Sequence, residues 1–444
     1  MDTIERSRIG IVGGGVTGLT AAYSLASTGH NVTVYESASQ VGGLSSGFKA
    51  PHWDWSVENF YHHWFASDKH ILALIEELGW SDQVLFPRPD TVIYWEGEFY
   101  PFDSIFTNIP LFILRHFPLD VIRYGIGGLY LRFLSRSWEP LEAVTADEWT
   151  RRWFGPRVHA LQWKPLLVSK FGEENAREVN MAWLWARLRS RTTRLGTFVG
   201  GIQTFLDKLA DRLRSLGVEF RLDSPVSRIE HISAGQPARL SMKSGSDSVD
   251  YDAVISTSSP AAMVEMTPAL PEHYAASLRA LKSMGAVVLI LSLKQRLTKY
   301  YWHNLPKDAG FPFLALVEHT NYVGPEHFGG DHIVYCGDYL DPGHEYFTMS
   351  KEELLDRFLP ALKRFNPDFD RSWINETWTW SAAYAQPVPP VHHSRNIPSL
   401  RTPVPGLYFA SMSQIYPWDR GTNYAVEMGQ RIARMVQKDL ALGR

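Results

Sequence analysis

The sequence has little cysteine, little net charge and no long uncharged apolar run. Cys336 is the single cysteine in 444 residues, which excludes an internal disulfide framework and any metal site built from several cysteines. The formal net charge is -3, so the chain lacks the basic excess that is typical of nucleic-acid-binding proteins. We therefore expect a protein of a reducing compartment, the cytoplasm, that binds no nucleic acid.

No segment is both long enough and free enough of charge to cross a membrane. The nearest is 105–134, in which charged residues and two prolines interrupt an apolar run. We expect a buried pair of helices here, and contact with a bilayer surface or the wall of an apolar tunnel is the alternative. The run Ile9–Val12 is likewise too short to be the core of a secretory signal peptide.

Length and composition indicate a globular protein of two domains. A chain of 444 residues is too long for one simple core. Hydrophobic residues make up 45% and charged residues 20%, which is ordinary for such a protein. The 16 tryptophans suit an apolar pocket or a membrane-facing patch, and a large aromatic core explains them as well.

The segment GIVGGGVTGLTAAYSL has the pattern of a turn that holds a pyrophosphate. Arg8–Val12 is predicted to be a buried strand, and Gly13, Gly15 and Gly18 follow it with the spacing G-x-G-x-x-G. The first glycine permits a tight turn and the second lets the backbone approach the pyrophosphate. The third lets the following helix lie close to the strand.

The next elements complete a strand–turn–helix–strand unit. A helix is predicted from about Val16 to Ser27, and the amides of its first turn, those of Val16 and Thr17 among them, stabilise the phosphate charge. A second strand over Asn31–Tyr35 ends at Glu36, whose carboxylate can accept hydrogen bonds from both ribose hydroxyls of an adenosine. It would repel a 2′-phosphate, which argues against NADP. This order of elements is the context that the motif requires, so we expect a bound dinucleotide; a glycine-rich turn without a ligand is the alternative.

Beyond Glu36, the segment SASQVGGLSSGF places Gly42 and Gly43 just after the acid. Here the sequence resembles the flavoprotein family of amine oxidases, protoporphyrinogen oxidases, phytoene desaturases and UDP-galactopyranose mutases. Many relatives have basic residues on both sides of the Gly-Gly turn, where this chain has Gln40 and Leu44, which weakens an amine oxidase assignment more than it weakens FAD. The resemblance implies FAD as the cofactor, held by Gly13, Gly15, Gly18, Glu36, Gly42, Gly43 and Leu44.

A second block, Val199–Glu230, matches the same family. An amphipathic helix is predicted over Ile202–Ser215, followed by a strand over Val218–Leu222. In the family this strand leads to a valine whose backbone meets the adenine, so Val226 is the candidate here. The segment YDAVIS that follows resembles the family's strand beneath the FAD.

A third block, GLYFASMSQIYPWDRGTNYAVEMGQRIARMV, follows much later in the chain. A strand over Leu407–Ala410 precedes a helix that starts at Gly421. In the family this helix points its N-terminus at the flavin pyrimidine ring, where it stabilises the negative charge of the reduced flavin. Ser411 and Met412 replace the family's Gly-Asp, and Asp419-Arg420 is a candidate replacement. The resemblance implies flavin contacts from the amides of Gly421, Thr422 and Asn423.

The three blocks predict an α/β protein with a discontinuous Rossmann-like FAD-binding domain and an α+β substrate-binding domain. The first domain is expected to comprise residues 1–65, 198–262 and 400–444. The second is expected to comprise residues 66–197 and 263–399.

No catalytic dyad is visible, as expected where a flavin supplies the chemistry. In ENFYHHWF, where the family chain passes near the flavin, His62 and His63 are candidate acids or bases, and packed histidines are the alternative. In WTWSAAYAQPVP, Trp378, Trp380 and Tyr384 suit the wall of a substrate cavity, and core packing is the alternative. We take His62 and Tyr384 as the candidate catalytic residues. No carboxylates stand beside them at metal-ligand spacing, so no metal is predicted.

Two basic segments suit an anionic group on a substrate. Lys164 and Lys170 lie in WKPLLVSKFG, which resembles a segment of the protoporphyrinogen oxidase and desaturase branch. Arginines crowd the segment WARLRSRTTR and suit a carboxylate, phosphate or pyrophosphate. A solvated basic surface is the alternative for both segments. The arginines are Arg187, Arg189, Arg191 and Arg194.

The leading hypothesis is an FAD-dependent oxidoreductase that takes a hydride from a C–H or C–N bond of a largely apolar or polyprenyl-like substrate. The expected partner is a small molecule that is apolar or partly anionic. One alternative resembles UDP-galactopyranose mutase, a flavin-dependent isomerase that acts on a nucleotide sugar without net redox change. The other is a flavin-bearing accessory protein with no turnover. Peripheral contact with a membrane is an open alternative beside these hypotheses.

Overall fold

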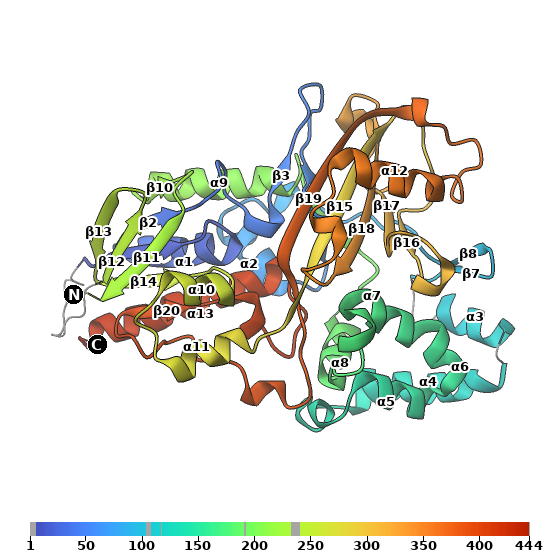
Figure 1. The fold of residues 1–444 in the computed structure, drawn as a ribbon, viewed down its shortest axis with the longest axis horizontal. Coiled ribbons are helices and arrows are strands. Elements are labelled where there is room, and N and C mark those ends of the chain that lie inside the picture. The colour runs from blue at the N-terminus through green and yellow to red at the C-terminus, as the bar shows by residue number, and fades with distance from the viewer. Residues whose placement is uncertain (1–5, 104–107, 117, 191, 232–239, 444) are drawn as a thin grey trace.

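The computed structural model describes residues 6–103, 108–116, 118–190, 192–231 and 240–443. They form two lobes that lie side by side, with both ends of the chain in the same lobe (Figure 1). That lobe is built on a parallel sheet, and the other on a seven-stranded sheet with helices beside it. The predicted α/β fold class is therefore confirmed.

The parallel sheet has five strands in the order β10-β2-β1-β14-β20. Its strands read as short apolar runs because helices or a second sheet cover both faces. They come from three separate parts of the chain, as the three sequence blocks predict, although the exact domain boundaries stay a prediction. The strands are β1 (Arg8–Val12), β2 (Asn31–Tyr35), β10 (Glu219–Arg221), β14 (Ala253–Ser256) and β20 (Leu407–Phe409).

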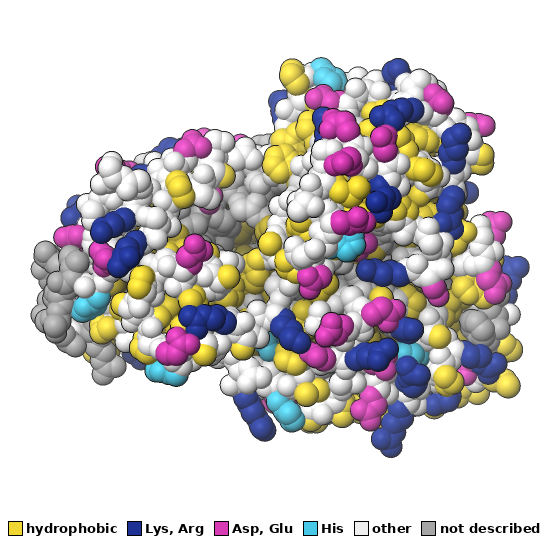
Figure 2. All heavy atoms as spheres, in the orientation of Figure 1, with side chains coloured by type: hydrophobic (Ala, Val, Ile, Leu, Met, Phe, Trp, Pro, Cys, Tyr) yellow, Lys and Arg dark blue, Asp and Glu magenta, His cyan; other side chains and the backbone are white. Residues whose placement is uncertain are grey.

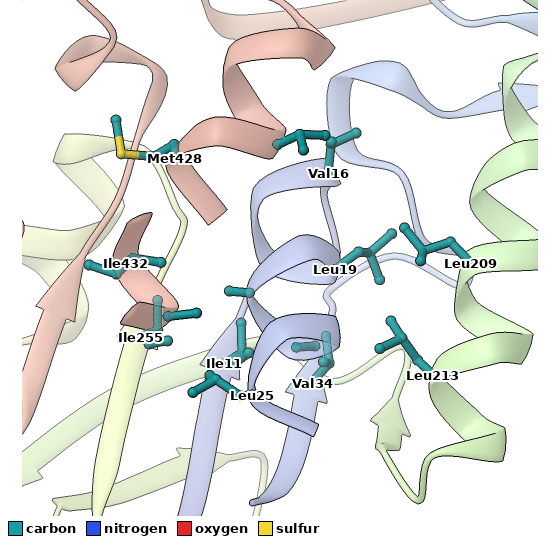
Figure 3. Close-up of a cluster of buried hydrophobic side chains, with 14 of the residues drawn as sticks. Ile11, Val16, Leu19, Leu25, Val34, Leu209, Leu213, Ile255, Met428 and Ile432 are labelled. Carbon is teal, nitrogen blue, oxygen red and sulfur yellow. The ribbon is translucent and has the colours of Figure 1, made fainter. Parts of the chain in front are cut away.

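Three helices cover one face of this sheet: α1 (Val16–Ala26), α9 (Ile202–Ser215) and α13 (Thr422–Ala441). The helices α9 and α13 flank α1, and a Cβ on Gly429 of α13 would lie only 2.6 Å from the Thr17 carbonyl oxygen. Figure 3 shows the apolar side chains that join these helices to the strands; they include Ile11, Leu19, Val34, Leu209 and Ile432.

The other face packs against a three-stranded antiparallel sheet and two short helices. The core on this side joins alternate strand residues, such as Val12 and Tyr35, to these elements. The elements are β11 (Val226–His231), β12 (Leu240–Ser244), β13 (Asp247–Tyr251), α10 (Pro260–Met266) and α11 (Glu272–Arg279).

The second lobe contains a seven-stranded sheet in the order β19-β15-β18-β17-β16-β7-β8. All neighbours are antiparallel except β16 and β7, which run parallel and join two distant parts of the chain. The strands are β7 (Thr91–Trp95), β8 (Glu98–Pro101), β15 (Ser283–Leu293), β16 (Trp302–Asn304), β17 (Ala315–Glu318), β18 (His332–Leu340) and β19 (Ile374–Pro387). Cys336 lies buried in β18, and burial raises the pKa of its thiol well above the ordinary value.

Of the other described helices, α2 (Lys69–Glu77) packs on α13 in the core of the first lobe, and the rest belong to the second lobe (Figure 1). The rest are α3 (Asn108–His116), α4 (Val121–Leu129), α5 (Ala146–Phe154), α6 (Pro156–Val158), α7 (Lys164–Asn175), α8 (Met181–Ser190) and α12 (Lys351–Leu362). Two small sheets, β3-β4 and β5-β9-β6, contain the remaining described strands. They are β3 (Gly47–Phe48), β4 (Val57–Glu58), β5 (Trp64–Phe65), β6 (Val84–Leu85) and β9 (Leu195–Phe198). Among the described residues, no helix is long and apolar enough to span a bilayer.

Candidate functional site

The turn between β1 and α1 is closed so tightly that only glycine fits its key positions. Gly13 has a φ of +106°, and a Cβ there would lie 2.4 Å from the Thr257 hydroxyl oxygen. A Cβ on Gly18 would lie 2.0 Å from the Gly13 carbonyl oxygen. Gly15 precedes the first residue of α1, Val16, so the helix starts directly at the turn with Thr17 in its first turn.

A second glycine segment lies against this turn. The Gly42 amide donates to the Gly14 carbonyl over 2.9 Å. Gly42 and Gly43 both have positive φ, at +131° and +57°, and a Cβ on Gly43 would lie 3.3 Å from the Gly15 Cα. The two segments therefore present backbone rather than side chains to each other, with half-buried Leu44 directly after them.

Glu36 lies at the end of β2 beside the same turn. Its Oε2 accepts a hydrogen bond from the Gly14 amide over 2.7 Å, and its Oε1 accepts one from the Ala38 amide over 2.9 Å. The Ser224 amide donates to the Glu36 carbonyl, which brings the chain that leads to half-buried Val226 next to this carboxylate. The geometry fits the nucleotide half of a dinucleotide, with an oriented carboxylate beside a cradle of backbone groups.

The start of α13 lies at the junction of the lobes. Gly421 precedes the helix, and Thr422 and Asn423 begin it. The Asn423 side chain is already used, because its Oδ1 accepts hydrogen bonds from the His70 amide over 2.8 Å and the Ile71 amide over 3.3 Å. The Asn423 Oδ1 is therefore not available to a ligand, whereas the backbone amides of this helix start can act on one through the helix dipole.

A cavity of about 670 Å³ opens in front of this helix start. Its wall is formed by the segment around Tyr61, by α7 and α8, by strands β7 and β16, and by residues 419–424. This volume is in the range of small-molecule sites. The glycine turns do not line the cavity, so the predicted cofactor residues form two groups, one at the ends of β1 and β2 and one at the cavity.

Two of the candidate acid–base residues line the cavity. Burial, and then the Arg420 guanidinium, lower the pKa of His62 to about 4, so its imidazole is neutral at pH 7. Its Nδ1 hydrogen-bonds the Phe60 carbonyl, which can only accept, so Nδ1 holds the proton and Nε2 has a lone pair. His63 also lines the cavity, with its Nδ1 3.5 Å from the Tyr301 hydroxyl.

One wall of the cavity is cationic. The Arg420 guanidinium donates to the Tyr339 hydroxyl, and the Lys170 ammonium lies 4.3 Å from the centre of the same ring. Arg187 also lines the cavity and forms an ion pair with Asp419. The Nε of Arg420 is buried and, among the described residues, has no hydrogen-bond partner. A buried donor of this kind is a place for an anionic or polar ligand atom.

Other predicted contacts lie away from the cavity. The Tyr384 hydroxyl lies 2.6 Å from the Ser413 Oγ and is not among the cavity-lining groups, so its catalytic role stays a prediction. Trp378 and Trp380 pack against Phe48, which supports core packing rather than a cavity wall. Lys164 does not line the cavity either.

Of the predicted arginine cluster, Arg187 alone among the described residues reaches the cavity. The Arg189 guanidinium donates to the Ser135 carbonyl, and that of Arg194 lies over the Phe86 ring. Arg191 lies outside the described residues. Asp419, expected as a possible cofactor contact, is instead engaged by Arg187 and by the Trp183 indole, whose Nε1 donates over 3.3 Å.

The sequence analysis missed three groups that the fold brings to this region. Tyr339 lies in a buried strand of the second lobe, where no local pattern marks it. Tyr61 stands beside the histidine pair and lines the cavity with it. Glu58 is buried, accepts from the Ile202 amide over 3.1 Å at the start of α9, and has its pKa raised to about 7 by burial. Among the described residues, no group of three potential metal ligands gathers.

Comparison with known proteins shows which family the chain matches. The model of the family described as flavin containing amine oxidoreductase matches residues 16–437. Amine oxidase [flavin-containing] A of Bos taurus is 25% identical over 98% of this chain and 85% of its own length. Protoporphyrinogen oxidase 1, chloroplastic, of Spinacia oleracea is 26% identical over 43% of this chain and 34% of its own. A solved structure, the putative protoporphyrinogen oxidase from Exiguobacterium sp. 255-15, covers 98% of this chain and 100% of its own, with 18% identity and a TM-score of 0.78, which shows a shared fold.

Proposed function

We propose, from the premise that the chain belongs to the flavin-containing amine oxidoreductase family and is an FAD-dependent oxidoreductase, that its substrate is a largely apolar organic molecule with an anionic group. The observation that supports this substrate class is the cavity, whose wall combines apolar side chains with buried cations. The predicted hydride transfer from a C–H or C–N bond is part of the proposal.

We infer that the glycine turns hold the FAD pyrophosphate and that Glu36 holds the adenosine ribose. The cradle is lined by backbone, and Glu36 is oriented by two amides, so both could engage these groups without moving. The start of α13 would then stabilise negative charge on the flavin at one end of the cavity. When bound, the flavin supplies the acceptor for the hydride.

The apolar part of the cavity suits a hydrocarbon body. Phe102, Ile109, Trp163, Leu184 and Trp302 line it and come from five separate parts of the second lobe. Burying apolar surface against them stabilises a bound molecule by roughly 25 cal/mol per Å². A small hydrophilic substrate would leave this wall without a partner.

The cationic wall selects the charge of the substrate. Arg420 and Lys170 flank the Tyr339 ring, and His62 is neutral, so the net field at this wall is positive. A carboxylate or phosphate would satisfy the buried Arg420 Nε, whereas an ammonium group would be repelled. The proposed substrate thus differs from what the name amine oxidase says of the relatives.

His62 is the candidate to accept a proton from the substrate. Its Nδ1 hydrogen bond to the Phe60 carbonyl fixes the tautomer, so Nε2 is the basic atom. The low pKa keeps this atom unprotonated across the neutral range.

The test of the function is anaerobic mixing of the purified yellow protein with apolar donors and, separately, with NADH and NADPH, while the flavin absorbance is followed. Bleaching by an apolar donor supports the proposal. Bleaching by nicotinamide alone would contradict it and would indicate a reductase, or an isomerase of nucleotide sugars that needs reduced flavin but consumes no electrons.

The substrate class is tested by ligands that share one chain and differ in charge. Dodecanoate should perturb the flavin spectrum and raise the Tm, while dodecanol should bind more weakly and dodecylamine not at all. Arg420→Met should weaken dodecanoate binding by at least roughly tenfold, because it removes hydrogen bonds to a charged group. Arg194→Met is the matched control, since that arginine is exposed and does not line the cavity. Equal binding of the amine and the acid would refute the charge selection.

A further inference from the structure

The helices α3 and α4, the 3-10 turn Pro118–Asp120 and the π-helical turn Tyr130–Leu134 expose a set of large hydrophobic side chains, here called the α3–α4 face. Elsewhere in the described chain only four large hydrophobic residues are exposed: Leu85, Trp153, Val199 and Leu442. Those of the α3–α4 face are 50% to 80% exposed. They are Leu111, Leu114, Leu119, Ile122, Ile126, Leu129, Phe133 and Leu134.

Packing of the core does not explain why these hydrophobic side chains are exposed. Helix α4 already buries one face through Tyr124 and Gly127, and a Cβ on Gly127 would lie 2.7 Å from the Phe154 ring. Its exposed residues Ile122, Ile126 and Leu129 repeat at helical spacing on another face. The expectation of a buried helix pair is therefore wrong, and an apolar patch of this extent marks an interaction site.

The charges around the α3–α4 face are positive. Residues 108–136 contain four arginines and one acidic residue. That residue, Asp120, is buried and paired with Arg157 over 2.9 Å, so it does not neutralise the exposed arginines. Arg115, Arg123 and Arg136 are all exposed, in a protein whose formal net charge is -3. The segment that forms the apolar patch thus carries a positive net charge.

Two further features adjoin the face. The partly exposed Trp153 ring stacks on Tyr130 with 5.4 Å between centroids, and tryptophan and tyrosine are enriched where proteins meet the membrane surface. Ile109 of α3 and Arg132 line the cavity, so the face borders the candidate substrate site. In Figure 1 the helices lie at the end of the second lobe away from the chain termini, and Figure 2 shows hydrophobic side chains there among basic and some acidic ones.

We propose that the α3–α4 face docks the protein on the surface of a bilayer that contains anionic phospholipids. The apolar side chains enter the region between headgroups and acyl chains, and the exposed arginines contact the lipid phosphates. The apolar side chains match the acyl region of such a bilayer, and the arginines match its phosphates. An apolar protein partner would leave the arginines without acidic groups to pair with. The inference does not depend on the substrate class, although it places the cavity beside the lipid.

The test is flotation of the purified FAD-loaded protein with vesicles of phosphatidylcholine and with vesicles that also contain phosphatidylglycerol. We expect the wild type to float with the anionic vesicles and to be released as salt screens the arginines. The double variant Ile126→Ser, Leu129→Ser should lose at least roughly tenfold in its partition, because two apolar side chains no longer enter the interface. Arg115→Gln with Arg136→Gln should reduce the preference for anionic vesicles.

The matched control is Leu442→Ser. Leu442 is 55% exposed, as are Ile126 and Leu129, but it lies beyond α13 in the other lobe. It should bind vesicles as the wild type does, and unchanged flavin spectra should show that all variants are folded. Absence of flotation, or equal loss in the control, would overturn the proposal. So would a wild-type dimer in solution that the double variant converts to monomer, because a second copy would then cover the face.

Discussion

At the residue scale, Gly18 shows how closely α1 approaches the strand before it. A Cβ there would lie 2.0 Å from the Gly13 carbonyl oxygen, an atom of the backbone that cannot move aside without opening the turn. We expect Gly18→Ala to lower the Tm and to abolish retention of FAD during purification. The measurement is the flavin-to-protein absorbance ratio together with thermal unfolding.

The control for Gly18 is another helical glycine, Gly125 in α4. A Cβ there meets nothing within 4 Å, so Gly125→Ala should leave FAD bound and raise stability by about 0.5 to 1 kcal/mol. If both alanine variants keep their flavin, the close approach at Gly18 does not control cofactor binding.

Glu58 gives a pH-dependent prediction at the same scale. Burial raises its pKa from 4.5 to about 7, so between these values the folded protein holds a proton that the unfolded chain has lost. Stability from this group therefore falls as pH rises through that window. Glu58→Gln cannot ionise and keeps an acceptor for the Ile202 amide. Its stability relative to wild type should rise between pH 5 and pH 8 by up to about 3 kcal/mol.

Urea unfolding at the two pH values measures this difference. Glu352→Gln is the control, because its side chain is 71% exposed and pairs only with a neighbouring lysine on the surface. A Glu58→Gln effect that is the same at both pH values would show that Glu58 is ionised throughout.

The residues of the site differ in how far the sequence could predict them. Gly13, Gly18 and Glu36 stand within one local unit, so spacing alone assigns their positions. Tyr339 and Arg420 are in contact only because the fold brings β18 and the start of α13 together. No sequence pattern near either residue indicates that the other is its partner. Their pairing needs tertiary structure.

At the scale of elements, a residue of another helix caps the N-terminus of α2. Its own N-cap, Asp68, makes no side-chain cap, and the Asn423 Oδ1 of α13 accepts from the first amides of α2 instead. Asn423→Ala should therefore cost about 1 to 2 kcal/mol. Asn423→Asp keeps the acceptor and favours the helix dipole, so it should retain most of the stability.

Hydrogen exchange in the first turn of α2 separates this capping role from a general loss of packing. Faster exchange at His70 and Ile71 in Asn423→Ala, but not in Asn423→Asp, is the expected result. Equal destabilisation by both substitutions would mean that the amide group of Asn423, rather than its acceptor oxygen, is required.

Helices with a clear hydrophobic period could be predicted from the sequence. Elements whose burial or place in a sheet depends on distant segments could not. The amphipathic pattern of 202–215 gives α9 with the observed bounds. Of the segment 105–134, residues 105–107 and 117 lie outside the described residues, and the rest forms helices apolar on both faces, so periodicity could not say which face is buried. The order of the seven strands in the second lobe depends on contacts between distant segments, which no local pattern contains.

At the scale of the whole molecule, the parallel sheet and the junction of the lobes form one unit around the cofactor residues. FAD that binds only the folded protein should raise its stability by about 2.7 kcal/mol at a free concentration one hundred times Kd. We expect the Tm to rise with added FAD in wild type and not in Gly18→Ala. Thermal unfolding over a series of FAD concentrations measures this, and a Tm independent of FAD would contradict the assignment of the cradle.

The order of the parallel sheet has a consequence for how the protein is made on the ribosome. Strand β1 at Arg8–Val12 emerges early, but β20 at Leu407–Phe409 and the helix that packs on α1 are translated long after it. Until then the nascent chain exposes the edge of β14 and the apolar side of α1, which are surfaces that chaperones recognise. We expect FAD to be incorporated only after translation has passed these elements. A stop codon placed before Leu407 would therefore yield a chain that has its glycine motif and yet never becomes a flavoprotein.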